Sequence, residues 1–220
     1  DLHVRSRRQR QMCIRDSNGC ELRNAADNVR SGIISYLGHD PELFNDSVRN
    51  NVLLGDDYDV FEYLRVVCMD KEVEAMEQGA DTIIGSEGIR LSGGQAQRIA
   101  LARTLCHKKL VLVLDDPFSA LDRNTEEQIY KKLKDMASDN IVILISHRLY
   151  MFPKMDKVIW MDAGMVNVGT HKELMLECPG YRKMYETVSV EECRAVETEN
   201  EGLAAAKVVE NSRRVVDKHE

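Results

Sequence analysis

Long apolar runs are missing from this sequence of 220 residues. The two longest, 110–114 and 141–145, contain five residues each, whereas a membrane-spanning helix needs about 20. The sequence therefore predicts no transmembrane helix within these residues. Positive charge is also in short supply, because 30 Lys and Arg against 37 Asp and Glu give a net charge of −7. This balance argues against a broad nucleic-acid-binding surface.

Closely spaced cysteines are missing too. The six cysteines stand apart and form no CxxC pair, at positions 13, 20, 68, 106, 178 and 193. The spacing disfavours a disulfide framework or a zinc site, and we interpret these residues as reduced thiols of a cytosolic protein. Hydrophobic residues make up 43% and charged residues 30% of the chain, which predicts an ordinary globular protein with one core and room for a small subdomain.

The two ends of the chain differ in composition from its middle. Residues 1–17 contain five arginines and two acids without helical or strand periodicity. Transit peptides are Arg-rich as well, but no amphipathic face emerges here, so we interpret 1–17 as a non-native or artefactual leader. Residues 189–220 are acid-rich and lack aromatic side chains, which predicts a helical or disordered tail. The folded domain is therefore expected over residues 18–188.

Between the ends, strand and helix patterns alternate. Residues 110–114 and 141–145 are rich in β-branched side chains, as in parallel strands covered on both faces. A helix between them, starting at a capping box over 125–128, predicts a right-handed strand–helix–strand crossover. The other expected elements are strand 32–37, helix 48–54 capped within 45–47, helix 60–67 capped by Asp57 or Asp59, helix 95–106, a hairpin of 158–161 with 165–168, and closing helices 171–176 and 181–187.

Two adjacent glycines stand where the 95–106 helix is expected to begin, in the run Leu91-Ser92-Gly93-Gly94-Gln95. Backbone of this kind directs several N–H groups to one point, and the helix dipole adds positive potential there. Such a point binds an anion, most naturally a phosphate. Because most short Ser-Gly-Gly runs are plain loops, the run by itself leaves both interpretations open.

Polar residues follow both predicted parallel strands. Asp115 and Asp116 follow the first strand, and Ser146 and His147 follow the second. The carboxyl ends of parallel strands share one edge of the sheet, where open α/β sheets bind ligands. An Asp that leaves a buried strand commonly holds Mg²⁺ beside nucleotide phosphates. The alternative for Asp115 is a helix cap or a turn, and the Asp pair alone does not decide between them.

Taken together, these residues carry a family resemblance. The segment 90–105, RLSGGQAQRIALARTL, resembles the signature motif of ATP-binding cassette (ABC) proteins, and 109–122, KLVLVLDDPFSALD, resembles their Walker B strand and D-loop. The segment 141–149, IVILISHRL, resembles the H-loop strand. Residues 34–55 resemble the Q-loop and the entry to the helical subdomain of exporter-type cassettes, and 168–175, VGTHKELM, matches their usual ending.

The resemblance covers about residues 18–188 and implies an α/β fold. Its parts would be a partial RecA-like parallel sheet core, an inserted α-helical subdomain over about 45–108 that carries the signature, and an antiparallel edge hairpin. The implied cofactors are ATP and Mg²⁺. Family cassettes pair head to tail, so each ATP lies between the phosphate loop of one chain and the signature of the other.

The resemblance also implies a role for each residue at the strand ends. Asp115 would organise Mg²⁺, and Asp116 stands at the position of the general base that polarises water. His147 would contact the γ-phosphate and hold base and water in line, although a histidine after a strand is more often structural. His39 stands where a glutamine normally links Mg²⁺ and water to the transmembrane domain.

The remaining implied contacts lie across a cassette dimer. Ser92, Gly93 and Gly94, with Gln95, would bind the γ-phosphate of an ATP held by the second cassette. Asp122 would cross the dimer interface. The implied partners are therefore a second cassette, in a homodimer or more readily a heterodimer, and a transmembrane domain that contacts the helical subdomain. No nucleic acid is expected as a partner.

Three departures from the family pattern bear on activity. The sequence contains no GxxxxGK[ST] phosphate loop (Walker A), so we expect an N-terminally truncated fragment that binds little ATP in isolation. Asp116 replaces the usual glutamate, which withdraws the carboxylate by about 1.5 Å, one C–C bond, and His39 replaces the usual glutamine. Together these changes predict a slow or degenerate ATP site beside an intact signature, as in one half of a heterodimeric exporter.

The resulting prediction is an ATP-hydrolysing subunit of an ABC exporter. It would attach to the cytoplasmic face of the membrane through a transmembrane domain outside these residues, and ATP-dependent dimerisation of cassettes would drive transport. Two alternatives stay open, namely a regulatory subunit that holds ATP without hydrolysing it and a soluble ABC-type ATPase acting on DNA or ribosomes. Proteins of the latter kind usually carry coiled-coil insertions or tandem cassettes, and this sequence shows neither.

Overall fold

The structure, a computed structural model, describes residues 32–187 apart from 41, 86–87 and 163, together with two short strands near the start of the chain. These strands, β1 (Asp16–Ser17) and β2 (Cys20–Glu21), pair in antiparallel fashion. Most of the expected leader 1–17 and all of the tail 189–220 lie outside the described residues. The chain divides into two compact units, residues 1–146 and residues 147–220.

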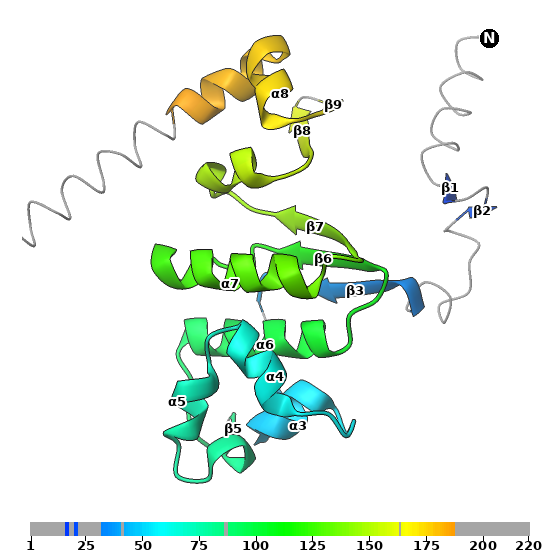
Figure 1. Ribbon diagram of the computed structural model, residues 1–220. Coiled ribbons are helices and arrows are strands. Elements are labelled where there is room, and N and C mark those ends of the chain that lie inside the picture. The colour runs from blue at the N-terminus through cyan, green and yellow to red at the C-terminus, as the bar shows by residue number, and fades with distance from the viewer. Residues whose placement is uncertain are drawn as a thin grey trace, which may run out of the picture. The chain divides into compact units, whose positions relative to one another are not determined.

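A parallel sheet runs through the first unit. Its strands, in spatial order, are β3 (Ile34–Leu37), β6 (Val111–Asp115) and β7 (Ile141–Ile145) (Figure 1). Helix α7 (Arg123–Met136) connects β6 to β7, so the predicted strand–helix–strand unit is confirmed. The predicted first strand is shorter than expected, because residues 32–33 are helical.

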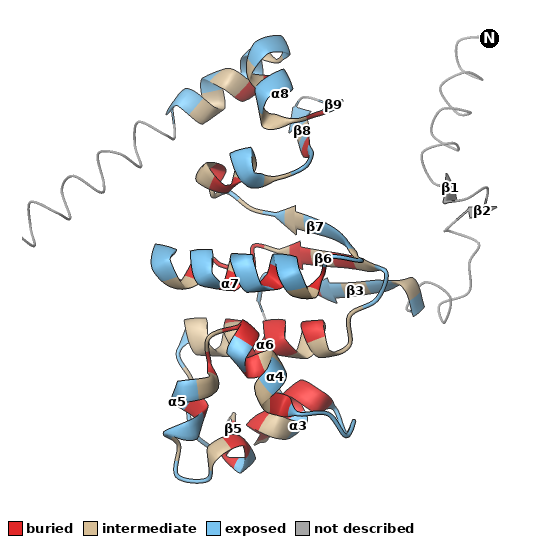
Figure 2. Ribbon diagram, in the orientation of Figure 1, coloured by how far each residue is buried: buried red, intermediate tan, exposed pale blue. Residues whose placement is uncertain are grey.

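The two faces of this sheet differ in burial. Leu112 and Leu114 of β6 are buried, whereas Ile141, Ile143 and Ile145 of β7 are 58%, 40% and 50% exposed (Figure 2). The parallel register places these three isoleucines on the face opposite to Leu112 and Leu114. The prediction that residues 141–145 are covered on both faces is therefore wrong for the described part of the chain. β7 lies at the edge of the described sheet, and Val142, which shares a face with Leu112, is also 39% exposed, so neither face of β7 is fully covered.

Short helices precede the signature and lead into it. In chain order the elements are β4 (Asp46–Ser47), α3 (Val48–Leu53), α4 (Val60–Val66), α5 (Asp70–Glu74), the 3₁₀ helix η1 (Gly79–Asp81), β5 (Ile83–Ile84) and α6 (Gly93–Cys106). Helices α3 and α4 pack against α6, and most of the side chains buried in these helices are apolar, including Val48, Val52, Leu64, Ile99 and Leu101. The predicted caps are confirmed, since Ser47 accepts the Asn50 N–H and Asp59 accepts the Phe61 N–H.

Two helices begin earlier than the sequence patterns predict. Helix α6 starts at Gly93 rather than Gln95, because the Ser92 hydroxyl accepts the Gln95 N–H while the Gln95 side chain accepts the Ser92 N–H. Helix α7 starts at Arg123 and is capped by Asp122, whose Oδ1 accepts the Thr125 N–H at 3.0 Å. The predicted capping box over 125–128 is therefore wrong, because Thr125 is the donor in a cap that begins further upstream.

The second unit consists of a hairpin and helices. Its elements are η2 (Leu149–Lys154), the antiparallel strands β8 (Val158–Asp162) and β9 (Met165–Gly169), and α8 (His171–Glu177), after which residues 179–187 are also helical. The predicted hairpin is thereby confirmed. Val158, Leu174 and Tyr181 form the core of this unit. In the described parts of both units, no helix is long and apolar enough to cross a membrane.

Candidate functional site

Two carboxylates stand at the end of the central strand β6. Asp115 is its last residue, and its Oδ2 accepts a hydrogen bond of 3.2 Å from the hydroxyl of Tyr36 on the adjacent strand β3. Desolvation and the charge of Asp115 raise the pKa of Tyr36, which keeps its hydroxyl a donor at neutral pH. The Asp115 carboxylate is thus oriented by a neighbouring strand.

Asp116 differs from Asp115 in both burial and backbone. It is 8% exposed and has a φ of 47°, in the left-handed region that non-glycine residues rarely adopt. Such a conformation costs about 1–3 kcal/mol and persists where surrounding contacts hold it. Two such contacts are evident: the Asp116 N–H donates to the Ile145 carbonyl at 2.8 Å, and the Asp116 carbonyl accepts from Gln97 Nε2 at 3.2 Å.

His39 lies beside Asp116, because β3 and β6 are adjacent parallel strands and each of these residues follows one of them; from the sequence, His39 is assigned to this site only by the family resemblance. Its Nδ1 is 3.7 Å from Asp116 Oδ2, a distance that makes an ion pair when the imidazole is protonated. The His39 side chain is 56% exposed and that of Asp116 is 12% exposed, so the pair opens to solvent on the histidine side. The structure therefore brings together three predicted site residues, namely Asp115, Asp116 and His39.

The signature forms the first turn of α6 and packs against the segment after β6. A Cβ atom added at Gly94 would lie 2.7 Å from the Ala120 carbonyl oxygen, whereas one added at Gly93 would lie 3.9 Å from Ala120 Cβ. Gly94 is therefore required for the close approach of two backbones, and Gly93 is not required for this contact. The segment that ends in Asp122 is thus seated on the start of α6.

Two predicted ligand-binding side chains already have protein partners. The Gln95 amide accepts from the Ser92 N–H and donates to Glu72 Oε2 at 2.8 Å. The Asp122 carboxylate caps α7, and its hydrogen bonds from Thr125 lower its pKa. Their roles toward ATP and across a dimer stay predictions.

His147 has no described geometry with respect to the carboxylates. It follows β7 in the sequence by two residues and opens the second compact unit. Its role toward the γ-phosphate stays a prediction from the family resemblance.

The sequence does not single out Tyr36 or Gln97, although Tyr36 donates to the Asp115 carboxylate and Gln97 donates to the backbone carbonyl of Asp116. Gln97 offers a faint signal, because it shares one buried face of α6 with Leu101 and Leu105 at a spacing of four residues. A polar residue on an apolar helix face needs a partner, and here the partner is the Asp116 carbonyl. Tyr36 carries no comparable signal, since a tyrosine in a strand is unremarkable.

The carboxylates fit Mg²⁺ that arrives with a nucleotide. In the described residues, no group of three or more His, Cys, Asp or Glu could hold a metal ion. Mg²⁺ in nucleotide enzymes is typically held by one or two carboxylates, with phosphate oxygens and water as the other ligands. Asp115, at a strand end and oriented by Tyr36, provides a carboxylate of this kind.

The chain resembles known proteins in both sequence and structure. Residues 14–119 match the family model described as ABC transporter. Over 171 residues, 75% of the chain, the sequence is 36% identical to the ATP-dependent lipid A-core flippase of Alcanivorax borkumensis. The chain belongs to the ABC transporter family.

Other ABC proteins resemble the chain to a similar extent. It is 35% identical over 163 residues, 72% of the chain, to P-glycoprotein 14 of Caenorhabditis elegans, covering 12% of that protein. A solved structure of a bacterial Atm1-family ABC exporter with ATP bound matches 78% of the chain with a TM-score of 0.72 and 29% identity, and 31% of that exporter is covered. Of the flippase, the chain covers 28%. The chain thus spans under a third of the length of these relatives.

The ABC family match also confirms the fold class expected from the sequence. A parallel sheet, helices that carry the signature, and an antiparallel hairpin are all present in the described residues. The lipid A-core flippase is named as ATP-dependent, and the solved structure of the Atm1-family exporter has ATP bound.

Proposed function

We propose that this chain is part of the ATP-hydrolysing cassette of an ABC exporter and that its signature completes an ATP site on a partner cassette. The cassette would work at the cytoplasmic face of a membrane, joined to a transmembrane domain. Its partner would be a second cassette, more readily a different one than a copy. ATP-dependent dimerisation of the two would drive transport.

The observation that carries the proposal is the grouping of Asp115, Asp116 and His39 at the ends of β3 and β6. Asp115, held by Tyr36, would contribute a carboxylate to Mg²⁺. Asp116 would polarise the attacking water, and His39 lies next to it, 3.7 Å away. Bound Mg²⁺ would neutralise charge that develops on the phosphates.

The same residues support a slow site of the chain's own. The carboxylate of Asp116 is withdrawn by about 1.5 Å, one C–C bond, compared with a glutamate at this position. Displacement of a catalytic group by about 1 Å can lower the rate roughly 100-fold. The first turn of α6, with Gly93 and Gly94 capped by Ser92, departs from the family pattern at none of these positions. The signature is therefore the part of the chain best suited to support fast hydrolysis of an ATP that a partner cassette binds.

A graft into a complete exporter tests this proposal. Residues 32–187 replace the matching segment in the lipid A-core flippase of A. borkumensis, so that the relative supplies the rest of the transporter. We expect slow ATP hydrolysis by the graft and an increase in kcat of about tenfold to 100-fold in Asp116→Glu. Asp115→Glu is the matched control, because it makes the same chemical change one residue earlier and should not raise kcat.

The same experiment distinguishes the hydrolytic proposal from a second candidate function. A regulatory subunit that holds ATP without hydrolysing it is favoured by the same two residues, Asp116 and His39. In that case the graft would bind ATP, while Asp116→Glu would leave hydrolysis at the background rate. No gain in kcat in a folded, ATP-binding graft would therefore count against the hydrolytic proposal and for the regulatory one.

A further inference from the structure

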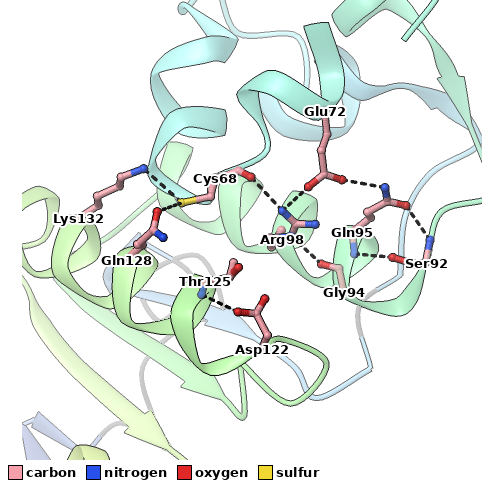
Figure 3. A network of polar contacts seen from close by, with 10 residues as sticks. All are labelled: Cys68, Glu72, Ser92, Gly94, Gln95, Arg98, Asp122, Thr125, Gln128 and Lys132. Carbon is pink, nitrogen blue, oxygen red and sulfur yellow. Dashed lines mark hydrogen bonds and ion pairs between the residues drawn. The ribbon is translucent and has the colours of Figure 1, made fainter. Parts of the chain in front are cut away.

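A single carboxylate holds two residues of the signature helix. Glu72 on α5 accepts from Gln95 Nε2 through Oε2 at 2.8 Å and from Arg98 Nη1 through Oε1 at 2.7 Å (Figure 3). Gln95 and Arg98 are three residues apart on α6 and therefore lie on the same side of the helix. The side-chain oxygen of Gln95, Oε1, accepts the backbone N–H of Ser92 at 2.9 Å. Glu72 thus stands one hydrogen bond away from the cap of α6.

Arg98 extends this network to the glycine backbone and to the end of α4. Its Nε donates to the Gly94 carbonyl at 3.2 Å, and its Nη1 also donates to the Cys68 carbonyl at 2.9 Å (Figure 3). Cys68 has a φ of 55° and follows α4 in the position that glycine usually takes when a helix ends in a Schellman motif. The Arg98 side chain is 11% exposed, so solvent competes little for its hydrogen bonds.

We propose that Glu72 is a positioning residue for the phosphate-binding end of α6, an inference that rests on the proposed function. Its two oxygens fix Gln95 and Arg98, and through them the Ser92 cap and the Gly94 carbonyl. The direction of the first N–H groups of α6, those of Gly93 and Gly94, follows from these contacts. None of the motifs in the sequence analysis contains Glu72, which lies 23 residues before Gln95.

A purely electrostatic role of Glu72 and a positioning role predict opposite effects on phosphate binding when Glu72 is neutralised. A carboxylate near a bound phosphate repels it, so a purely electrostatic role means that neutralising Glu72 tightens phosphate binding. Positioning means that the same change loosens binding, because Gln95 and Arg98 donate to different oxygens of Glu72 and a glutamine turns an NH2 group toward one of these two donors. The two roles therefore differ in sign in one measurement.

Three variants of the 220-residue chain separate these roles: Glu72→Gln, Glu72→Asp and Glu74→Gln. Glu74→Gln is the matched control, because it removes the same charge from an exposed position of the same helix. Hydrogen exchange of the backbone N–H groups of Ser92 and Gln95 reports on the cap of α6 in the absence of any ligand. The amide chemical shifts of Gly93 and Gly94, followed during titration with inorganic pyrophosphate, report on phosphate binding.

We expect Glu72→Gln to accelerate exchange of the Ser92 and Gln95 amides about tenfold and to weaken pyrophosphate binding about fivefold, both relative to Glu74→Gln. Glu72→Asp keeps the charge but is shorter by one methylene, so it should resemble Glu72→Gln rather than the unaltered chain. Rescue by Glu72→Asp, or tighter pyrophosphate binding in Glu72→Gln than in Glu74→Gln, would overturn the inference.

The exchange measurement keeps this inference separate from the proposed function. If pyrophosphate shifts neither glycine amide of the unaltered chain, the phosphate-binding role of the signature fails. The exchange rates still decide whether Glu72 holds the cap in that case. Equal exchange rates in Glu72→Gln and Glu74→Gln would refute positioning whatever the signature binds.

Discussion

Replacing Gly94 with alanine tests how closely the signature helix packs on the turn after β6. The added Cβ would lie 2.7 Å from the Ala120 carbonyl oxygen and 3.4 Å from Leu121 Cδ2. The oxygen belongs to the backbone, so it cannot rotate away as a side chain could. Either α6 or the 120–121 segment has to move, and the interior of a protein resists such a shift.

Gly93→Ala is the reference, because it places the same methyl group on the preceding residue of the same helix. Its Cβ would meet only Ala120 Cβ, at the ordinary contact distance of 3.9 Å. Alanine favours a helix over glycine by up to about 1 kcal/mol, and this gain largely cancels between the two neighbouring positions. Overpacking typically costs about 1–3 kcal/mol. We therefore expect Gly94→Ala to be less stable than Gly93→Ala by about 1–3 kcal/mol.

Urea unfolding of the two variants, followed by helical circular dichroism, measures this difference. The slope of the unfolding free energy against urea should be the same in both, because the surface exposed on unfolding hardly changes. Stabilities that agree within about 0.5 kcal/mol, the usual size of a neutral substitution, would refute the close backbone approach at Gly94. Such a result would also remove the packing reason for a glycine in the second position of α6.

Two further predictions concern polar groups that hold the helical region together. Asn51 is fully buried, and its Nδ2 donates to the carbonyls of Phe44 and Ser47, both at 3.0 Å. Asn51→Ala should therefore lower the free energy of unfolding by about 2–4 kcal/mol in a urea titration. The control Asn50→Ala, at an exposed position, should lower it by less than about 1 kcal/mol. Burial raises the pKa of Glu72, but hydrogen bonds from Gln95 and Arg98 outweigh this effect and hold the pKa below the usual value of a glutamate. Ionised Glu72 therefore stabilises the folded state fully at pH values above the usual pKa of a glutamate. This stabilisation is lost as the pH falls through the lowered pKa that Glu72 has in the folded state. Exchange of the Gln95 amide should accelerate there in the unaltered chain but not in Glu72→Gln.

The order of helices and strands could be predicted because it depends on short stretches of sequence. Ser47 and Asp59 cap helices as expected, since a cap involves only the next few residues. The start of α6 was predicted too late, because glycine counts against a helix while the Ser92 cap outweighs it locally. The cap of α7 was predicted at the wrong residue, because Asp122 and Thr125 both suit a cap and only the folded turn decides between them.

The candidate site could be predicted only where topology alone determines proximity. The end of the predicted strand 110–114 locates Asp115 and Asp116 at the edge where parallel sheets bind ligands, whereas the approach of His39 depends on the pairing of β3 with β6, which the sequence alone does not show. The hydrogen-bond partners of the two aspartates could not be predicted, because Tyr36 and Asp115 are 79 residues apart and Gln97 and Asp116 are 19 apart. Which long-range pair forms depends on the packing of whole elements, and a local pattern does not contain that information.

Helix α6 joins the two parts of the candidate site within one chain. Its first turn carries the signature, and Gly94 in that turn packs on Ala120. One turn later, Gln97 donates to the carbonyl of Asp116, whose left-handed backbone needs such support. A rotation or shift of α6 that re-aims the signature therefore also disturbs the residue at the position of the general base. Glu72 on α5 holds α6 through Gln95 and Arg98. A substitution of Glu72 should therefore disturb the hydrogen bond from Gln97 to Asp116 as well as the first turn of α6.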